Sequence, residues 1–152
     1  MRPTTKQAGW LAIAITAVCA YEGLSLKEYP DIGRVPTICY GETRGVQPGD
    51  VATKAQCDKR LSERLVEFNQ GVDSCVTADL PNKRRASFVS LSYNIGVSAF
   101  CKSTVVRRIN AGDVAGACEA VMMWDKVKGK HVQGLTNRRK RERDMCQEGL
   151  TQ

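Results

Sequence analysis

The sequence has little histidine and no closely paired cysteines. His131 is the only histidine among 152 residues, and none of the seven cysteines stands in a CxxC pair. Zinc sites are built from such groups at short spacing, so the composition offers no obvious zinc site. There is also no low-complexity stretch and no internal repeat with a period of about 20 to 50 residues, which excludes a disordered chain and a solenoid.

A long apolar run is also missing. Residues 8–21 (AGWLAIAITAVCAY) carry no charge and form the most apolar segment, but a bilayer span needs about 20 apolar residues. The length suits an export signal, although cleavage near Ala17 or Ala20 would remove the helix in front of Glu22. Two interpretations stay open. The segment is either the apolar first helix of the domain, or an uncleaved export signal held transiently in the inner membrane that later packs into the fold.

What the chain does have is positive charge. Its formal net charge is +7, from 23 basic and 16 acidic side chains, and such a surface attracts polyanions. The basic run at residues 138–143 is interrupted by acid, so a solvated helix face explains it as well as a polyanion site does. There is no nucleic-acid recognition motif and no interleaving of basic and aromatic residues, so we expect no nucleic-acid partner.

Seven cysteines are many for a chain of this size. Without a metal site to use them, they favour disulfide bonds in an oxidising compartment. Because seven is an odd number, at least one thiol is left over. The length of 152 residues fits one domain that can bury an adequate core.

Periodicity and turn residues predict a mainly helical α+β fold. The first helix spans about Thr5 to Gly23, and the turn-rich segment that follows holds a small hairpin around Thr37–Tyr40. Capping signals and apolar spacing then predict helices from the capping box at Thr53, over Asn82–Ile95, over Ser98–Asn110, from Asp113 to Trp124, and from Thr136 to about Glu148. We expect one domain over residues 1–152, with residues 1–21 as its apolar N-terminal helix. A hairpin lobe would pack on a C-terminal helical bundle with a cleft between them.

Two carboxylates near the first helix have the chemistry of a glycosidase. Such an enzyme needs an acid to protonate the leaving oxygen and a second carboxylate on the opposite side of the sugar. Glu22 ends the most apolar segment, where poor solvation would keep an acid protonated. Asp31 lies in the turn-rich stretch, where a carboxylate stays ionised, and the Thr37 hydroxyl could hold a water between the two. Such residue types are common, however, and their usual roles are a solvated helix end for Glu22 and a turn-former for Asp31.

A family resemblance turns this pattern into a specific hypothesis. The stretch YEGLSLKEYPDIGRVPTICYGETRGV closely resembles the catalytic region of the phage lysozyme (endolysin) family: E-G at a helix end, an aromatic-x-D, and a hairpin with W/P-T-[IV]-x-x-G. The resemblance continues in SLSYNIG, AFCKST, INAGD and the GL and RR pairs near residues 134–139. It covers nearly the whole chain from about residue 20 onward.

The resemblance implies a lysozyme-like fold and a muramidase that hydrolyses the bond between N-acetylmuramic acid and N-acetylglucosamine in peptidoglycan. Glu22 would be the general acid, Asp31 the carboxylate that orients water or stabilises positive charge, and Thr37 the residue that positions that water. Inversion at the anomeric carbon is expected. No cofactor is needed, and we expect a monomer that acts in the host periplasm on the cell wall and causes lysis. The alternatives are a lytic transglycosylase, which needs no water-activating partner, and an inactive wall-binding protein.

Five further residues are substrate-binding candidates. Glu42 stands where many relatives have histidine, and it either contacts substrate and repels the other carboxylates or is a solvated hairpin acid. Tyr93 and Trp124 could stack on sugar rings or be buried by packing. Asn94 could contact sugar or satisfy backbone groups. Arg138 lies near the cleft or merely covers the last helix.

The order of elements in this family makes one disulfide pattern sensible, and cysteines at similar places in relatives support it. The pairs would be Cys39–Cys57, Cys75–Cys101 and Cys118–Cys146, although the sequence alone allows many others. Cys19 would remain unpaired. It is either a small buried apolar side chain or a redox or membrane switch that keeps Glu22 misplaced until release.

Overall fold

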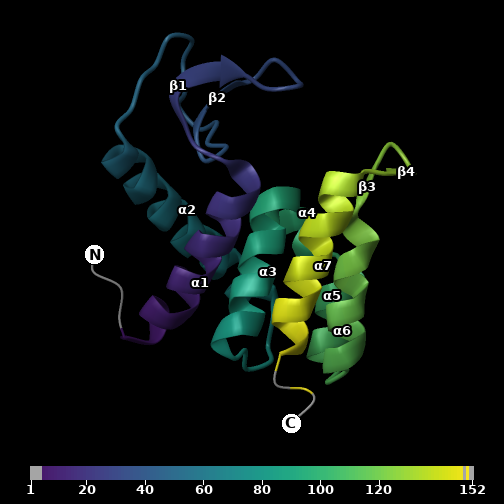
Figure 1. Cartoon of the computed structure of the whole chain (residues 1–152). Coiled ribbons are helices and arrows are strands. Elements are labelled where there is room, and N and C mark those ends of the chain that lie inside the picture. The colour runs from purple at the N-terminus through teal and green to yellow at the C-terminus, as the bar shows by residue number, and fades with distance from the viewer. Residues whose placement is uncertain (1–4, 149, 151–152) are drawn as a thin grey trace.

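The computed structural model describes residues 5–148 and 150 of the chain. Its elements follow the predicted order (Figure 1). In chain order they are α1 (Thr5–Glu22), β1 (Ser25–Pro30), β2 (Pro36–Cys39), α2 (Lys54–Cys75), α3 (Asn82–Ile95), α4 (Val97–Cys101), α5 (Thr104–Asn110), α6 (Val114–Ala120), the 3₁₀ helix η1 (Val121–Trp124), β3 (Lys126–Val127), β4 (Lys130–His131) and α7 (Gln133–Gln147).

Helix α1 is anchored in the core and ends at Glu22. Trp10, Ala14 and Val18 recur every four residues and are all buried, because this face of α1 packs against α2 and α3. Gly23 stops the helix with φ +68°, a conformation that glycine adopts without a steric penalty. Within residues 5–148 and 150, no helix has both the length and the hydropathy needed to cross a bilayer. Glu22 therefore sits on the last turn of a helix whose preceding turns are fixed by packing.

Strands β1 and β2 form the hairpin lobe that follows α1. They pair antiparallel, with Tyr29 opposite Thr37 and an irregular register between Ser25 and Tyr29. Beyond β2 the chain turns tightly, since the backbone groups of Ile38 and Glu42 exchange two hydrogen bonds of 2.9 Å. Figure 1 shows this lobe at one end of the molecule, beyond the C-terminal end of α1.

Helix α2 begins at the predicted capping box. The Thr53 hydroxyl accepts from the Gln56 N–H at 3.1 Å, and the Gln56 side chain accepts from the Thr53 N–H at 2.8 Å. The predicted apolar face is confirmed, with Leu61, Leu65 and Val72 buried. The helix therefore starts where its sequence satisfies the free backbone donors.

Helix α3 is the centre of the helical lobe. It has the predicted bounds and contacts α1, α2 and α7, and Figure 1 shows it between α1 and α7. Phe88 and Leu91 are fully buried. Because α1 and α7 pack on the same helix, residues from opposite ends of the chain come together beside α3.

The prediction of a single helix over Ser98–Asn110 is wrong. Helix α4 ends at Cys101 and α5 begins at Thr104. Between them, the Ser103 hydroxyl accepts from the Val106 N–H at 3.3 Å and caps a new helix. Serine satisfies a free N–H better at an N-cap than inside a helix, so the chain restarts there.

The last two predicted caps had different outcomes. Asp113 caps α6 as expected, accepting from the Gly116 N–H at 2.9 Å, but α6 gives way to the 3₁₀ helix η1 before Trp124. The predicted cap at Thr136 is wrong, because α7 already begins at Gln133. The Thr136 hydroxyl instead donates to the Asp125 carboxylate at 2.9 Å.

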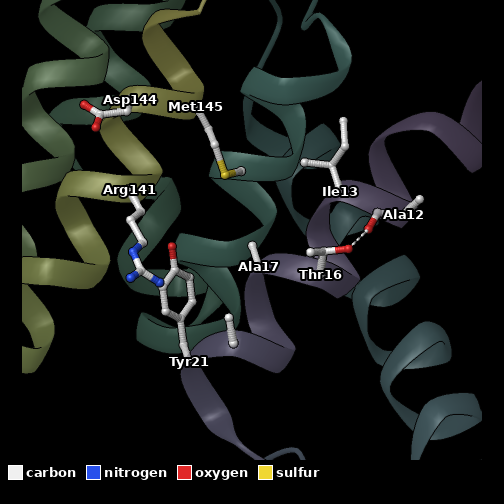
Figure 2. Close-up of a pocket in the computed structure, with 9 residues that line it drawn as sticks. Ala12, Ile13, Thr16, Ala17, Tyr21, Arg141, Asp144 and Met145 are labelled. Carbon is white, nitrogen blue, oxygen red and sulfur yellow. Dashed lines mark hydrogen bonds between the residues drawn. The ribbon is translucent and has the colours of Figure 1, made fainter.

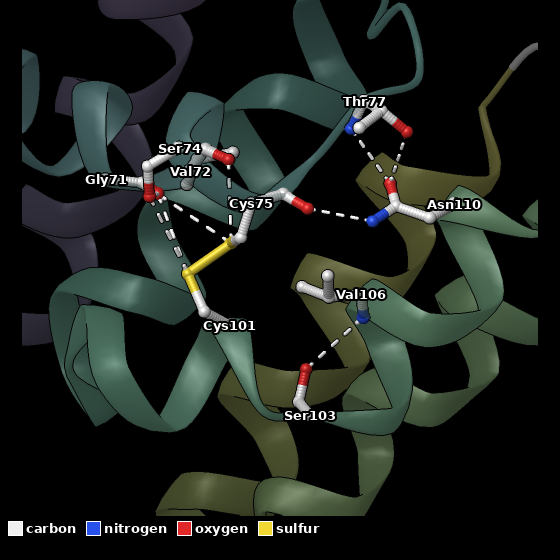
Figure 3. The surroundings of a disulfide bond; sticks show 9 residues. All are labelled: Gly71, Val72, Ser74, Cys75, Thr77, Cys101, Ser103, Val106 and Asn110. Atoms are coloured by element: carbon white, nitrogen blue, oxygen red, sulfur yellow. Dashed lines mark hydrogen bonds between the residues drawn. A yellow bond between two sulfur atoms is a disulfide. The ribbon is translucent and has the colours of Figure 1, made fainter.

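The three expected disulfides are confirmed: Cys39–Cys57, Cys75–Cys101 and Cys118–Cys146. Figure 3 shows the second, which joins the end of α2 to the end of α4. Beside it, the Asn110 side chain donates to the Cys75 carbonyl at 2.8 Å and accepts from the Thr77 N–H at 2.9 Å. Cys19 is unpaired and half-buried, and burial raises the pKa of its thiol. Whether it acts as a switch stays a prediction.

Candidate active site

Glu22 is held by an arginine from the other end of the chain. Its Oε1 accepts a charge-assisted hydrogen bond of 2.6 Å from Nη1 of Arg138 on α7. The Glu22 side chain is 23% exposed and that of Arg138 is 7% exposed, so the pair is largely shielded from water but still open on one side. The Arg138 guanidinium also lies over the Tyr21 ring, 4.7 Å from its centroid. The interpretation of Arg138 as a mere cover for α7 is therefore wrong.

The other oxygen of Glu22 faces the hairpin lobe. A Cβ atom built on Gly41 would lie 2.9 Å from Glu22 Oε2, so any other residue there would force the Glu22 carboxylate to shift. Gly41 also has φ +78°, a backbone conformation that favours glycine. The Gly41 backbone thus approaches Oε2, while Oε1 stays with Arg138.

Tyr93 joins α3 to the hairpin lobe. Its hydroxyl donates to the Tyr40 carbonyl at 2.8 Å, and its ring packs edge-on against Phe68 with centroids 5.2 Å apart. Burial raises the pKa of Tyr93, and the charges of Glu22 and Glu42 add to the effect. Tyr93 is therefore a neutral, anchored side chain close enough to both acids to be influenced by their charges. Stacking on a sugar ring stays a prediction.

Asp31 and Thr37 are brought together by the turn between the strands. Asp31 Oδ1 accepts from the Val35 N–H at 2.8 Å. The buried Thr37 hydroxyl donates to the Val35 carbonyl at 2.8 Å. Among the described residues, no hydrogen bond or ion pair joins either side chain to Glu22. The two groups thus share the hairpin, and their catalytic relation to Glu22 stays a prediction.

Glu42 is a buried anchor of the hairpin lobe. Its Oε1 accepts from the Arg44 N–H at 2.8 Å, and its Oε2 lies 3.2 Å from Nε of Arg64 on α2. Arg64 in turn lies over the Phe68 ring. The interpretation as a solvated hairpin acid is therefore wrong, because the carboxylate is buried and paired.

Glu42→Gln is expected to lower the free energy of unfolding by about 1–2 kcal/mol, because Arg64 loses its buried charged partner and keeps only the more exposed pair with Glu67. KM for peptidoglycan should stay within about twofold, because the lost contacts join protein to protein. Urea unfolding and turbidity kinetics measure the two effects. Glu63→Gln, which removes only an exposed pair with Lys59, is the matched control. A large rise in KM with unchanged stability would instead make Glu42 a substrate contact.

Within the described residues, neither of the remaining candidates forms a hydrogen bond or ion pair with Glu22. Asn94 is exposed, and its side-chain oxygen accepts from Arg139 at 2.8 Å. Trp124 is half-buried and packs against the core at the end of η1. Sugar contacts by either residue stay predictions.

His131 forms a local link at the β3–β4 hairpin. Its Nδ1 lies 2.8 Å from Oδ2 of the buried Asp125. The hydrogen bonds from His131 and Thr136 lower the pKa of Asp125. Within the described part of the chain, no three potential ligands among His, Cys, Asp and Glu come together to hold a metal ion.

A separate apolar pocket of about 610 Å³ lies between α1 and α7. Figure 2 shows Ile13 and Ala17 on one wall, Met145 opposite, and Arg141 beside the Tyr21 ring. Neither Glu22 nor any hairpin residue lines it. This pocket therefore lies outside the candidate active site, and its aromatic wall, Tyr21, is the residue directly before Glu22.

Sequence reasoning missed Glu142. It appeared only as an acid interrupting a basic run, but in the structure it is fully buried between Arg138 and Arg139. The usable signal was its spacing of three and four residues from these arginines, which places all three side chains on one helix face.

Comparison with known proteins assigns the family. The family model for phage lysozyme matches residues 19–142. The chain belongs to the phage lysozyme family. A SAR-endolysin of Enterobacteria phage P21 is 35% identical over 160 residues, which span 96% of this chain and 97% of the relative. A SAR-endolysin of Pseudomonas phage phiKMV is 36% identical and covers 93% of this chain and 91% of its own length.

A solved structure gives the same result. The endolysin from Escherichia coli O157:H7 phage FAHEc1 superimposes with a TM-score of 0.81 at 32% identity, covering 97% of this chain and 94% of that one. The expected lysozyme-like, mainly helical α+β fold is thus confirmed. So is the function: this member of the phage lysozyme family is an endolysin, a glycoside hydrolase that cleaves the glycan of peptidoglycan.

Proposed function

We propose that Glu22 is the general acid of this lysozyme, that Asp31 assists the attacking water, and that Thr37 positions it. The observation that carries the proposal is the two-sided environment of Glu22. Its Oε1 is engaged by Arg138 and its Oε2 faces the hairpin lobe at Gly41. Oε2 is therefore the oxygen that can carry a proton toward a sugar lying against the hairpin.

The reaction would follow from this arrangement. Glu22 Oε2 donates its proton to the glycosidic oxygen as the bond to the anomeric carbon breaks. A water attacks that carbon from the opposite face and gives its proton to the Asp31 carboxylate, which inverts the configuration. The Thr37 hydroxyl donates a hydrogen bond to the Val35 carbonyl. Its oxygen is therefore left to accept a hydrogen bond from the attacking water.

Asp31→Asn is expected to lower kcat by about a hundredfold or more. The amide oxygen can keep the hydrogen bond to the Val35 N–H, so the turn survives while the negative charge is lost. Turbidity kinetics on purified peptidoglycan, with thermal unfolding measured in parallel, provide the test. Asp79→Asn, an exposed aspartate between α2 and α3, is the matched control.

The hydroxyl of Thr37 has a test of its own in the same assay. Thr37→Ser should keep most of the activity and Thr37→Val should lose most of it.

Equal activity in Asp31→Asn and wild type would remove Asp31 from the mechanism without touching the role of Glu22.

We further propose that the protein acts as a monomer in the host periplasm and reaches it by transient inner-membrane association through the N-terminal segment. The uncharged run at residues 8–21 and the similarity to SAR-endolysins support this route. Fractionation of cells that express the whole chain should recover part of it with the inner membrane. Recovery from the cytoplasm alone would contradict the proposal.

A further inference from the structure

A buried cluster of charges lies directly behind Glu22. Arg138 Nε donates to Glu142 Oε1 at 3.2 Å, while Arg138 Nη1 donates to Glu22. Arg139 Nε lies 3.0 Å from Glu142 Oε2. Both Arg139 and Glu142 are fully buried. One guanidinium thus joins the proposed catalytic acid to a second, inaccessible carboxylate.

The charged neighbours of this cluster include Arg141, which lies over the Tyr21 ring, and Glu42, which is paired with Arg64. From α3, the Ser90 hydroxyl donates to Glu142 Oε1 at 2.8 Å, and the charge of Glu22 raises the pKa of Tyr93 further above the value that burial alone would give. From α1, the neutral Tyr21 ring lies under Arg138 and Arg141. From the hairpin lobe, Glu42 is neutralised by Arg64. Burial raises the pKa of Glu142, and the two guanidiniums oppose that effect and favour its charged form.

The buried pair of Arg139 and Glu142 is only partly hydrogen-bonded. Arg139 Nη2 donates to Glu142 Oε1 at 3.4 Å, whereas Arg139 Nε and Nη1 and Glu142 Oε2 are buried without a hydrogen-bond partner. A buried ion pair is often no better for stability than two apolar side chains of similar volume. The cluster therefore calls for an explanation other than stability.

The net charge of the cluster in each protonation state of Glu22 provides such an explanation. When Glu22 is ionised, two carboxylates face two guanidiniums and the cluster is neutral. When Glu22 is protonated, as a general acid must be, the cluster carries one positive charge. Without Glu142 the same step would leave two positive charges in a shielded environment, which is strongly unfavourable.

We propose that Glu142 is a positioning residue for catalysis, because it offsets the charge of Arg139 and fixes Arg138, so that only one net positive charge remains in the cluster when Glu22 carries its proton. The inference rests on the proposed role of Glu22 as the acid. On this inference, the charge of Glu142 offsets that of Arg139, and the balance between the two sets the upper pH limit of activity.

The sign of the effect differs between the two partners. Glu142→Gln adds net positive charge beside Glu22, which favours the ionised acid, so the alkaline limb of the kcat/KM profile should move down by roughly one pH unit. Arg139→Gln removes positive charge, which favours the protonated acid, so the limb should move up by about as much. The double variant carries both changes and should return close to the wild-type limb.

The experiment is a set of pH profiles of peptidoglycan clearing for these three variants and wild type. Glu119→Gln is the matched control, because Glu119 also pairs with an arginine of α7, Arg143, but at the exposed surface. Its alkaline limb should not move. Arg139→Met/Glu142→Met replaces the pair by apolar side chains of similar volume, and it keeps the test available if Glu142→Gln does not fold. Its limb should stay within about 0.3 pH units of wild type.

Opposite shifts in the two single variants support the proposal. Shifts in the same direction, no shifts in folded variants, or a full-unit shift in the Met/Met variant would overturn it. Glu22→Gln in the same assay separates this inference from the proposed function. Activity that survives in Glu22→Gln overturns both, whereas an inactive Glu22→Gln combined with unshifted limbs overturns only the role of Glu142.

Discussion

Glu22→Gln is expected to reduce the rate of peptidoglycan clearing by about a thousandfold, because the amide cannot donate a proton to the leaving oxygen. The fold should survive, since the amide oxygen can still accept from Arg138 and the side chain keeps its volume. Turbidity kinetics measure the loss, and far-UV circular dichroism with thermal unfolding measures the fold.

The control for this prediction is Glu28→Gln. Glu28 lies on the neighbouring strand β1, where its carboxylate accepts from the Gly49 N–H. The same chemical change there should leave the rate within about twofold. Loss of activity in Glu28→Gln to the same extent as in Glu22→Gln would mean that the amide substitution acts through the hairpin lobe rather than through the proton.

The second large effect concerns stability. Removing the Cys118–Cys146 disulfide, in Cys118→Ala/Cys146→Ala, should lower the free energy of unfolding by about 3–4 kcal/mol. The crosslink spans 28 residues and restricts the unfolded chain accordingly. Both cysteines are fully buried between α6 and α7, so the loss of packing adds to the effect. Urea unfolding under non-reducing conditions provides the measurement.

Cys19→Ala controls for the loss of a cysteine as such, because Cys19 forms no disulfide. Its free energy of unfolding should change by less than about 1 kcal/mol. Reduction of the wild type breaks all three disulfides, so it should lower the free energy of unfolding at least as much as the double variant does. Equal unfolding curves for wild type and the double variant would show that this disulfide does not contribute in solution.

Local signals predicted much of the fold. The capping box at Thr53 and the Asp113 cap work through side chains that satisfy nearby backbone donors, so a short window of sequence contains the whole interaction. The bounds of α3 followed from apolar spacing in the same way. The prediction failed at two residues whose capping role was not evident from the local pattern. Ser103 restarts a helix inside an apolar pattern that reads as continuous, and Thr136 serves the tertiary contact with Asp125 instead of capping.

The candidate site was predictable only in part. Glu22, Asp31 and Thr37 follow from family motifs because their spacing along the chain is short. The partner of Glu22 is 116 residues away, and its identity depends on how α1 and α7 pack on α3. The burial of Glu42 and Glu142 was not predicted for the same reason, since burial and pairing with Arg64 and Arg139 are tertiary properties that residue type alone does not reveal.

The most direct test of the hydrolytic mechanism is to digest purified peptidoglycan in water enriched with oxygen-18 and to analyse the fragments by mass spectrometry. Wild type should release reducing N-acetylmuramic acid ends that carry one oxygen-18 atom, and Glu22→Gln should release almost none. Anhydro-muramic acid ends without the label would make the enzyme a lytic transglycosylase, and labelled ends from Glu22→Gln at the wild-type rate would show that Glu22 is not the acid.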